Sequence, residues 1–169
     1  MSPPQSPREF FPNMPDEAFD MWLAPLITRY GWPLLSIDAA VSIETKWGAL
    51  LANIPLAFWH SSQWELRNIE LTPKAFAFSS QMLVDSIVDH CTRGAYTMTA
   101  NLGNTNQRFR ALAEYVSING RIPLPVVAVP RHGRFELVDG HHRIAAVFHC
   151  GIAATYRPPA YVAHFESHP

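Results

Sequence analysis

The chain has 169 residues, 48% of them apolar, which is enough to bury a substantial core in one compact domain. Thirteen basic and fourteen acidic side chains give a formal net charge of −1, which disfavours a general role in coating nucleic acid. The two cysteines, Cys91 and Cys150, form neither a disulfide framework nor a zinc motif and predict a reducing, cytoplasmic location. The apolar runs are far shorter than the roughly 20 residues that cross a bilayer, which predicts a protein without a membrane span.

Residues 1–15 form a Pro-rich arm, and its first twelve residues carry four prolines and little else to bury, which predicts that the arm is extended and mobile or lies over the surface. From Asp16 the apolar residues recur at helical spacing as far as Tyr30. We expect Pro25 to interrupt this helical segment and Gly31 to end it.

Residues 16–100 are expected to form a mainly helical extension packed on the same domain as the rest. Strand patterns occur at residues 41–43 and 64–71, whereas residues 46–53 fit a helix or a strand. All five tryptophans lie in this extension, where filling the core is their expected role. The alternative is an exposed aromatic surface that docks a protein partner. These residues are Trp22, Trp32, Trp47, Trp59 and Trp64.

The second half of the chain alternates between helical and strand patterns. We first expect a helix that begins at Ser79 or Ser80 and ends before Gly94, with an apolar face of Met82, Leu83, Ile87, Val88 and Cys91. A strand at 96–100, a polar loop at 101–106 and a helix from Gln107 to Asn119 follow. After these we expect strands at 124–129 and 134–138 around a turn at 130–133, a helix at 141–149, and short strands at 153–157 and 161–165. This order predicts an α+β fold with a small mixed sheet.

The run Asp139-Gly140-His141-His142-Arg143 joins a predicted strand to a predicted helix. Free backbone N–H groups at a helix start carry about half a positive charge, and Gly140 permits the backbone to approach a ligand closely. Arg143 can hold phosphate oxygens in a bidentate fork. The run therefore predicts a phosphate site. The alternative is that Gly140 only makes the turn and that the histidines lie on a solvated helix start.

The ionisable residues of this run offer acid–base and metal chemistry. His142 can act as general acid or base or donate to a phosphate, while His141 lines the same pocket. Asp139 is a candidate ligand for a divalent metal such as Mg²⁺, although Asp before Gly is equally a turn dipeptide. His149 at the helix end is expected to complement the helix dipole. The sequence does not decide which carboxylate activates water, and the candidates are Glu44, Glu114 and Glu136.

Two segments of the chain resemble the paired motifs of one superfamily. Gly140-His-His-Arg143 and the strand before it resemble the second conserved motif of ParB-like domains. The segment from Gln107-Arg108 to Val127 resembles the first motif and the strand that follows it. Over residues 104–157 the chain is therefore similar to the ParB/sulfiredoxin superfamily.

This resemblance implies that residues 101–169 form a ParB/sulfiredoxin-like core that binds the phosphates of ATP. It implies catalytic roles for His141, His142 and Arg143. The nucleotide-binding residues that it implies are Gly140, His141, His142, Arg143, Gln107 and Arg108. Sulfiredoxins carry a reactive cysteine directly after the corresponding glycine, whereas this chain has His141 there, so thiol chemistry is not expected. ParB partition proteins continue into a helix-turn-helix module, for which this chain has no room after residue 165.

The size and the Trp-rich N-terminal extension are similar to plasmid fertility-inhibition factors of the oncogenic-suppression (Osa) type. Such a resemblance implies a cytoplasmic ATPase and DNA nuclease that blocks conjugative transfer of a competing plasmid, acting at the inner membrane through a conjugation coupling protein. The cationic residues proposed to contact DNA without sequence preference are Arg110, Arg121, Arg131 and Arg134. The alternatives are a nucleotide-dependent binding protein that inhibits a secretion or partition component without catalysis, and a kinase of a small molecule such as a free amino acid.

Overall fold

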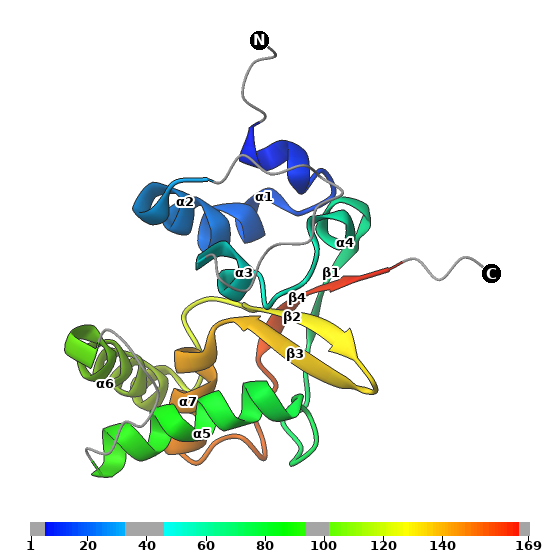
Figure 1. The fold of residues 1–169 in the computed structure, drawn as a ribbon. Helices are drawn as coiled ribbons and strands as arrows, with labels where there is room; N and C mark the ends of the chain where they lie inside the picture. Colours follow the sequence, from blue (N-terminus) through cyan, green and yellow to red (C-terminus); the bar gives the residue numbers. More distant parts are fainter. Residues whose placement is uncertain (1–5, 33–45, 94–101, 166–169) are drawn as a thin grey trace. The chain divides into compact units, whose positions relative to one another are not determined.

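A computed structural model describes residues 6–32, 46–93 and 102–165 of the chain (Figure 1). The chain divides into two compact units, one of residues 1–65 with 162–169 and one of residues 66–161. A four-stranded mixed sheet with the strand order β1-β4-β2-β3 accompanies several helices, so the predicted α+β class is confirmed. Within the described residues no helix combines the length and the apolar character that crossing a bilayer requires.

The N-terminal segment is folded over the residues that the structure describes. A 3-10 helix, η1 (Pro7–Phe10), opens it, and Phe10, Phe11 and Met14 are at most 3% exposed. The expectation that this stretch has little to bury is therefore wrong for residues 6–15. Its apolar side chains lie between prolines, so the composition alone concealed their contribution to the core.

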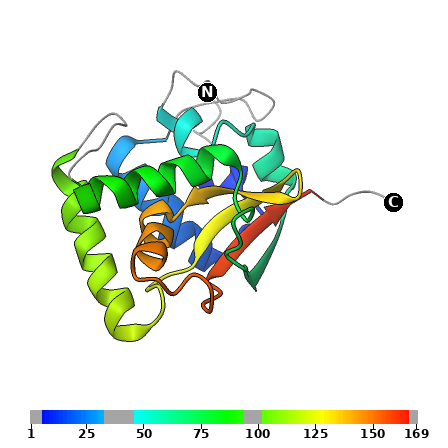
Figure 2. The same cartoon turned by 90° about the horizontal axis from the view of Figure 1, so that it is seen from below.

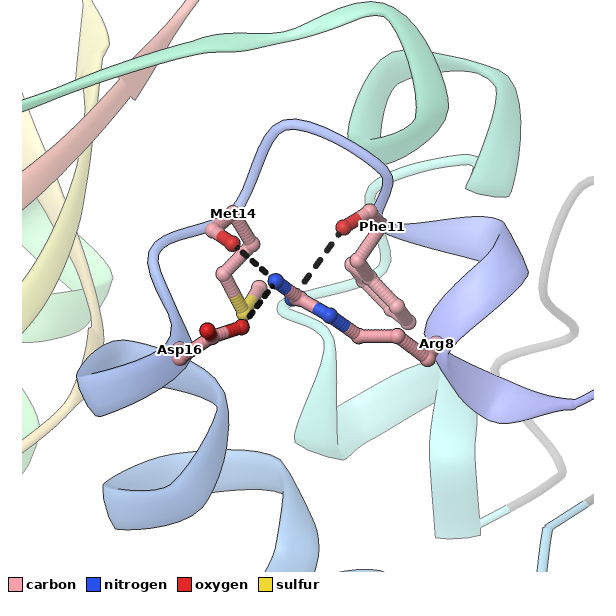
Figure 3. A network of polar contacts seen from close by, with 4 residues as sticks. All are labelled: Arg8, Phe11, Met14 and Asp16. Carbon is pink, nitrogen blue, oxygen red and sulfur yellow. Dashed lines mark hydrogen bonds and ion pairs between the residues drawn. The ribbon is translucent and has the colours of Figure 1, made fainter.

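Arg8 fastens this segment to the helix that follows (Figure 3). Its guanidinium donates to the carbonyl oxygen of Phe11 at 3.3 Å, to that of Met14 at 2.5 Å and to the Asp16 carboxylate at 2.7 Å. The same group lies 5.1 Å from the ring centroid of Phe19. One side chain thus satisfies two backbone carbonyls of a non-repetitive segment and pairs with the first residue of α1 (Asp16–Ala18).

The helical segment predicted from residue 16 is present and ends where expected. α1 runs into a π-helical turn, η2 (Phe19–Leu23), and then into α2 (Ala24–Tyr30). The interruption predicted at Pro25 is this π turn, which ends two residues before the proline, so that Pro25 falls in the first turn of α2, where its missing N–H is tolerated. Gly31 adopts φ 72° and its N–H bonds to the carbonyl of Ile27 at 2.9 Å, which closes α2.

The stretch that fits a helix or a strand is helix α3 (Lys46–Leu50), and α4 (Leu56–Ser61) follows it. The strand predicted next is β1 (Gln63–Asn68). The strand predicted at 41–43 lies outside the described residues, as do Glu44 and the predicted strand at 96–100.

Most of the tryptophans fill the core, as their expected role requires. Trp22, Trp47 and Trp59 are at most 4% exposed, and Trp32 and Trp64 are half-buried. The ring centroids of Trp22 and Trp59 lie 5.4 Å apart, and those of Trp32 and Trp47 lie 4.7 Å apart. Tilted and edge-on pairs at these distances add to the energy of burial.

The unit of residues 66–161 carries the predicted phosphate site. Its elements are α5 (Phe78–Arg93), α6 (Leu102–Asn119), β2 (Val126–Arg131), β3 (Arg134–Asp139), α7 (His141–His149) and the start of β4 (Pro159–His164). α7 packs against α5 and α6 (Figure 2), and its residues 144–147 are fully buried. The start of α7 is therefore held by packing on more than one side.

Three details differ from the sequence predictions. α6 begins at Leu102, so the loop predicted at 101–106 is wrong for residues 102–106, which are helical despite the low helix propensity of Gly and Asn. Residues 153–157 form turns instead of a strand, while the strand predicted after them is β4. α5 begins one residue before Ser79, and its buried face includes Val84 and Ile87, whereas Met82 is 43% exposed. The domain boundary predicted at residue 100 falls outside the described residues and stays a prediction.

The hairpin predicted around 130–133 is confirmed. β2 and β3 pair antiparallel, and Arg131 faces Arg134 across a two-residue turn. His132 and Gly133 have φ angles of 51° and 75°, the positive values that a tight hairpin turn between right-handed strands requires. A bulge lies between Val127 and Ala128, opposite the end of β3.

Candidate functional site

The candidate site begins where β3 passes into α7. Gly140 occupies this turn with φ 100°, a value that side chains rarely adopt. A Cβ placed on it would lie 2.5 Å from Cγ1 of Val126 and 3.0 Å from Nη2 of Arg143. Glycine is therefore required both by the backbone angle and by the space between β2 and the guanidinium.

A cavity of about 440 Å³ opens beside this turn. It is lined by the whole run from Asp139 to Arg143 and by Arg108, Ala111 and Leu112 of α6. The structure thus brings Arg108 to the second motif, as the nucleotide-site prediction requires. Gln107 does not line the cavity and is exposed.

Two wall residues were missed as site residues in the sequence. Neither Ala111 nor Leu112 was among the predicted site residues. Both lie three to four positions after Arg108, which is the spacing of one helical face. That spacing, counted from the predicted ligand Arg108, is the signal that identifies them.

Arg143 and Asp139 form an ion pair at the N-terminal end of α7. Nη2 of Arg143 lies 2.5 Å from Oδ2 of Asp139, and the two side chains are 14% and 32% exposed. Within the described residues, Nε of Arg143 and Nε2 of His142 are buried and have no hydrogen-bond partner. Such groups are costly to leave unpaired, so a polar ligand in the cavity would relieve them.

Both histidines of the run are uncharged at neutral pH. Burial lowers the pKa of His141 from 6.5 to about 4, although the Asp139 carboxylate opposes the shift. Burial also lowers the pKa of His142 to about 4, and the positive charge of Arg108 adds to that effect. A bound anion would raise both pKa values, because it favours the charged imidazolium.

The start of α7 is open to an anion. The N-cap, Gly140, offers no side chain, and the first backbone bond of the helix runs from the N–H of Ile144 to the Gly140 carbonyl at 3.0 Å. The N–H groups before Ile144 therefore have no carbonyl partner within this nine-residue helix. Together with two arginines, they form an arrangement that can hold phosphate oxygens.

Of the carboxylates considered as a base, none lines this cavity in the described part of the chain. Glu114 is exposed and faces a separate hollow of about 480 Å³, and Glu136 is buried beside α5. Among the described residues that line the cavity, Asp139 is the one carboxylate. The described residues contain no group of three or more metal-ligating side chains, so Mg²⁺ binding by Asp139 stays a prediction.

The arginines predicted to contact DNA are not gathered in one patch. Arg110 lies on α6 and Arg121 follows it, whereas Arg131 and Arg134 flank the β2–β3 turn. The views of Figures 1 and 2 agree that this turn and α6 lie on opposite sides of the unit. All four side chains are exposed, but no single duplex contact follows from their positions.

Cys150 and His149 lie away from the cavity. Burial raises the pKa of the Cys150 thiol, which donates to the carbonyl of Ala113 at 3.4 Å. The ring of His149 meets Phe109 edge-on at 5.1 Å. Neither side chain contributes to the candidate site.

The chain matches no family model, no curated protein and no solved structure in comparisons with known proteins. Its likeness to the ParB/sulfiredoxin superfamily therefore stays a prediction.

Proposed function

We propose that the cavity between α6 and the start of α7 binds the phosphates of a nucleotide. The observation that carries this proposal is the convergence of Arg108 and Arg143 on the uncapped start of α7 within one cavity of about 440 Å³. Nε of Arg143, a buried donor that lacks a partner in the described residues, supports it. A phosphate oxygen would satisfy this donor.

Charge favours an anion of low net charge or one that arrives with a cation. Arg108 and Arg143 against Asp139 give the cavity wall a formal charge of +1, because both histidines are neutral. A phosphate drawing Arg143 away from Asp139 would free that carboxylate. Asp139 would then hold Mg²⁺, which neutralises phosphate charge when bound, since Mg²⁺ commonly uses one carboxylate together with substrate phosphates.

We propose further that the bound phosphoryl group is hydrolysed. His142 presents a buried imidazole nitrogen without a partner among the described residues, and it would accept a proton from the attacking water. The arginines would stabilise the charge that develops on the phosphoryl oxygens. An anion beside the ring raises the pKa of His142 from its low value, which makes it a better base.

The wider function that we propose is a ParB-like ATPase and non-specific DNA nuclease that inhibits conjugative transfer by a competing plasmid. Support for this comes from the sequence resemblance. One observation favours a second candidate, a nucleotide-dependent binding protein without catalysis: Asp139, the only carboxylate among the described residues of the cavity wall, is paired with Arg143. A kinase of a small molecule would use the same phosphate contacts.

Titration of the full chain with ATP, ADP and inorganic phosphate, with and without Mg²⁺, tests the binding proposal. Arg108→Ala should weaken nucleotide binding about tenfold or more, the scale of a lost charge-assisted hydrogen bond. Arg110→Ala is the matched control, because this arginine lies on the same helix, is exposed and does not line the cavity. Equal losses in the two variants, or no binding by the parent chain, would remove the phosphate site.

Single-turnover hydrolysis separates the enzyme from the binding protein. His142→Gln should reduce hydrolysis more than affinity if the ring acts chiefly in the transition state. A mating assay with this variant then tests the wider function, since an enzymatic inhibitor should lose DNA cleavage and inhibition together. Full inhibition by a variant that no longer cleaves would favour the binding protein.

A further inference from the structure

A third hollow, of about 430 Å³, lies between the start of α5 and the β2–β3 turn. We call it the hairpin groove, and the lining residues that matter are Phe78, Ser79, Arg131, Arg134 and Glu136. It lies on the opposite side of the unit from α6, which forms one wall of the phosphate cavity (Figures 1 and 2). The hairpin groove is therefore a separate site.

Hydrogen bonds and an ion pair connect the polar side chains that line the hairpin groove. The Glu136 carboxylate accepts hydrogen bonds from Ser79 at 2.9 Å and from Ser80 at 3.2 Å, and it lies 3.7 Å from Nη1 of Arg131. The Ser80 hydroxyl in turn accepts the N–H of Leu137 at 2.8 Å. Because its carboxylate is already hydrogen-bonded and paired with Arg131, Glu136 provides a fixed wall.

Beside this groove, backbone groups of the segment before α5 already pair with the edge strand β3. The N–H of Ala77 donates to the Phe135 carbonyl at 2.8 Å, and the N–H of Phe135 donates to the Ala75 carbonyl at 2.8 Å. An extended ligand cannot pair with the backbone of β3 at these positions. A ligand in the groove must therefore be recognised by side chains.

The groups that remain available are one apolar surface and one cation. Phe78 is 76% exposed, and Met82, one turn further along α5, is 43% exposed. The side chain of Arg134 is exposed and has no hydrogen-bond or ion-pair partner in the described part of the chain. A large exposed phenylalanine next to a hollow is typical of a recognition surface.

The charges distinguish between classes of ligand. Arg131 and Arg134 against Glu136 give a net charge of +1, and Arg131 already faces the carboxylate. A nucleic-acid strand brings one negative charge per nucleotide, and these charges would lie over Glu136, where Arg134 is the one unpaired arginine among the described lining residues. A segment with one carboxylate beside an apolar side chain matches both Arg134 and Phe78.

We propose that the hairpin groove docks a protein segment that carries an apolar side chain next to a single carboxylate. The apolar side chain packs on Phe78 and Met82, and the carboxylate pairs with Arg134. This inference does not depend on the phosphate cavity. Loss of nucleotide binding would leave it standing.

The test uses the isotopically labelled full chain and synthetic peptides with a Leu-Glu or Phe-Glu centre in a Gly-Ser background. Matched peptides replace the glutamate by lysine or the apolar residue by serine. The parent peptides should shift backbone signals of residues 76–82 and 131–136, and the matched peptides should not. Arg134→Glu and, separately, Phe78→Ser should each weaken peptide binding about tenfold, whereas Arg110→Glu on α6 should not.

Both groove substitutions are at exposed positions, so an unchanged thermal unfolding midpoint verifies that each variant is folded. Absence of shifts with every peptide would overturn the proposal. So would a short oligothymidylate that shifts the groove signals when the peptides do not. Self-association of the parent chain that Phe78→Ser abolishes would make the occupant a second copy of this chain and would also overturn it.

Discussion

Gly140→Ala tests the geometry on which the candidate site depends. The substitution places a Cβ 2.5 Å from Cγ1 and 2.9 Å from Cβ of Val126, and these are branched atoms of a fully buried strand residue that cannot swing aside. Overpacking of this kind costs about 1–3 kcal/mol. A side chain at a positive φ such as 100° costs about 1–2 kcal/mol more. Alanine also restricts the unfolded chain, which returns about 0.4–1 kcal/mol, so the free energy of unfolding should fall by roughly 1–4.5 kcal/mol.

Gly151→Ala is the matched control for this prediction. Gly151 also has a positive φ, 72°, but no atom would lie within 4 Å of its Cβ. Only the backbone cost of about 1–2 kcal/mol applies, less the stabilisation of about 0.4–1 kcal/mol that alanine gains by restricting the unfolded chain. The two variants should therefore differ by about 1–3 kcal/mol, the overpacking cost alone.

Urea unfolding of both variants measures this difference. Far-ultraviolet circular dichroism follows the whole chain, whereas tryptophan fluorescence reports only on the unit of residues 1–65, since all five tryptophans lie there. Hydrogen exchange of α7 supplies the probe for the unit of residues 66–161. Costs that agree within about 0.5 kcal/mol, the usual additivity error, would refute the contact with Val126 as the reason for glycine.

Three further predictions follow from other parts of the structure. Stability should fall as pH drops from 6.5 to about 4, because the unfolded histidines bind protons there and folded His141 and His142 do not. Each of the two pKa shifts corresponds to at most about 3 kcal/mol of the free energy of unfolding. His142→Gln should therefore flatten the pH dependence of urea unfolding. An unchanged dependence of stability on pH would contradict the burial of this ring. Arg8→Ala should lower the free energy of unfolding by about 1–2 kcal/mol, because the Phe11 and Met14 carbonyls lose their donor. The tryptophan fluorescence transition should then occur at a lower urea concentration. A transition at the parent concentration would show that these contacts are dispensable. Cys91→Ser combined with Cys150→Ser should leave nucleotide hydrolysis intact, and loss of activity in a folded double variant would restore thiol chemistry.

Much of the site was predictable because its signals are local. A glycine between an apolar strand and an apolar helix predicted the turn at Gly140, and the structure gives that residue a positive φ. The hairpin turn at His132-Gly133 was predictable for the same reason. Arg108 was nominated only through the resemblance between two separated motifs, and the structure places it on the cavity wall.

The sequence by itself determined the order of helices and strands after residue 78 in most places and the residue types at the start of α7. Periodicity and turn chemistry act between neighbours, so they can be recognised without the fold. Only the tertiary structure decided that Arg143 pairs with Asp139, that burial leaves His141 and His142 uncharged, and that Glu136 belongs to the hairpin groove. Only the tertiary structure separated the four arginines onto different sides of the unit. These properties depend on contacts between residues distant in sequence and on the exclusion of water, and neither is written in a local pattern.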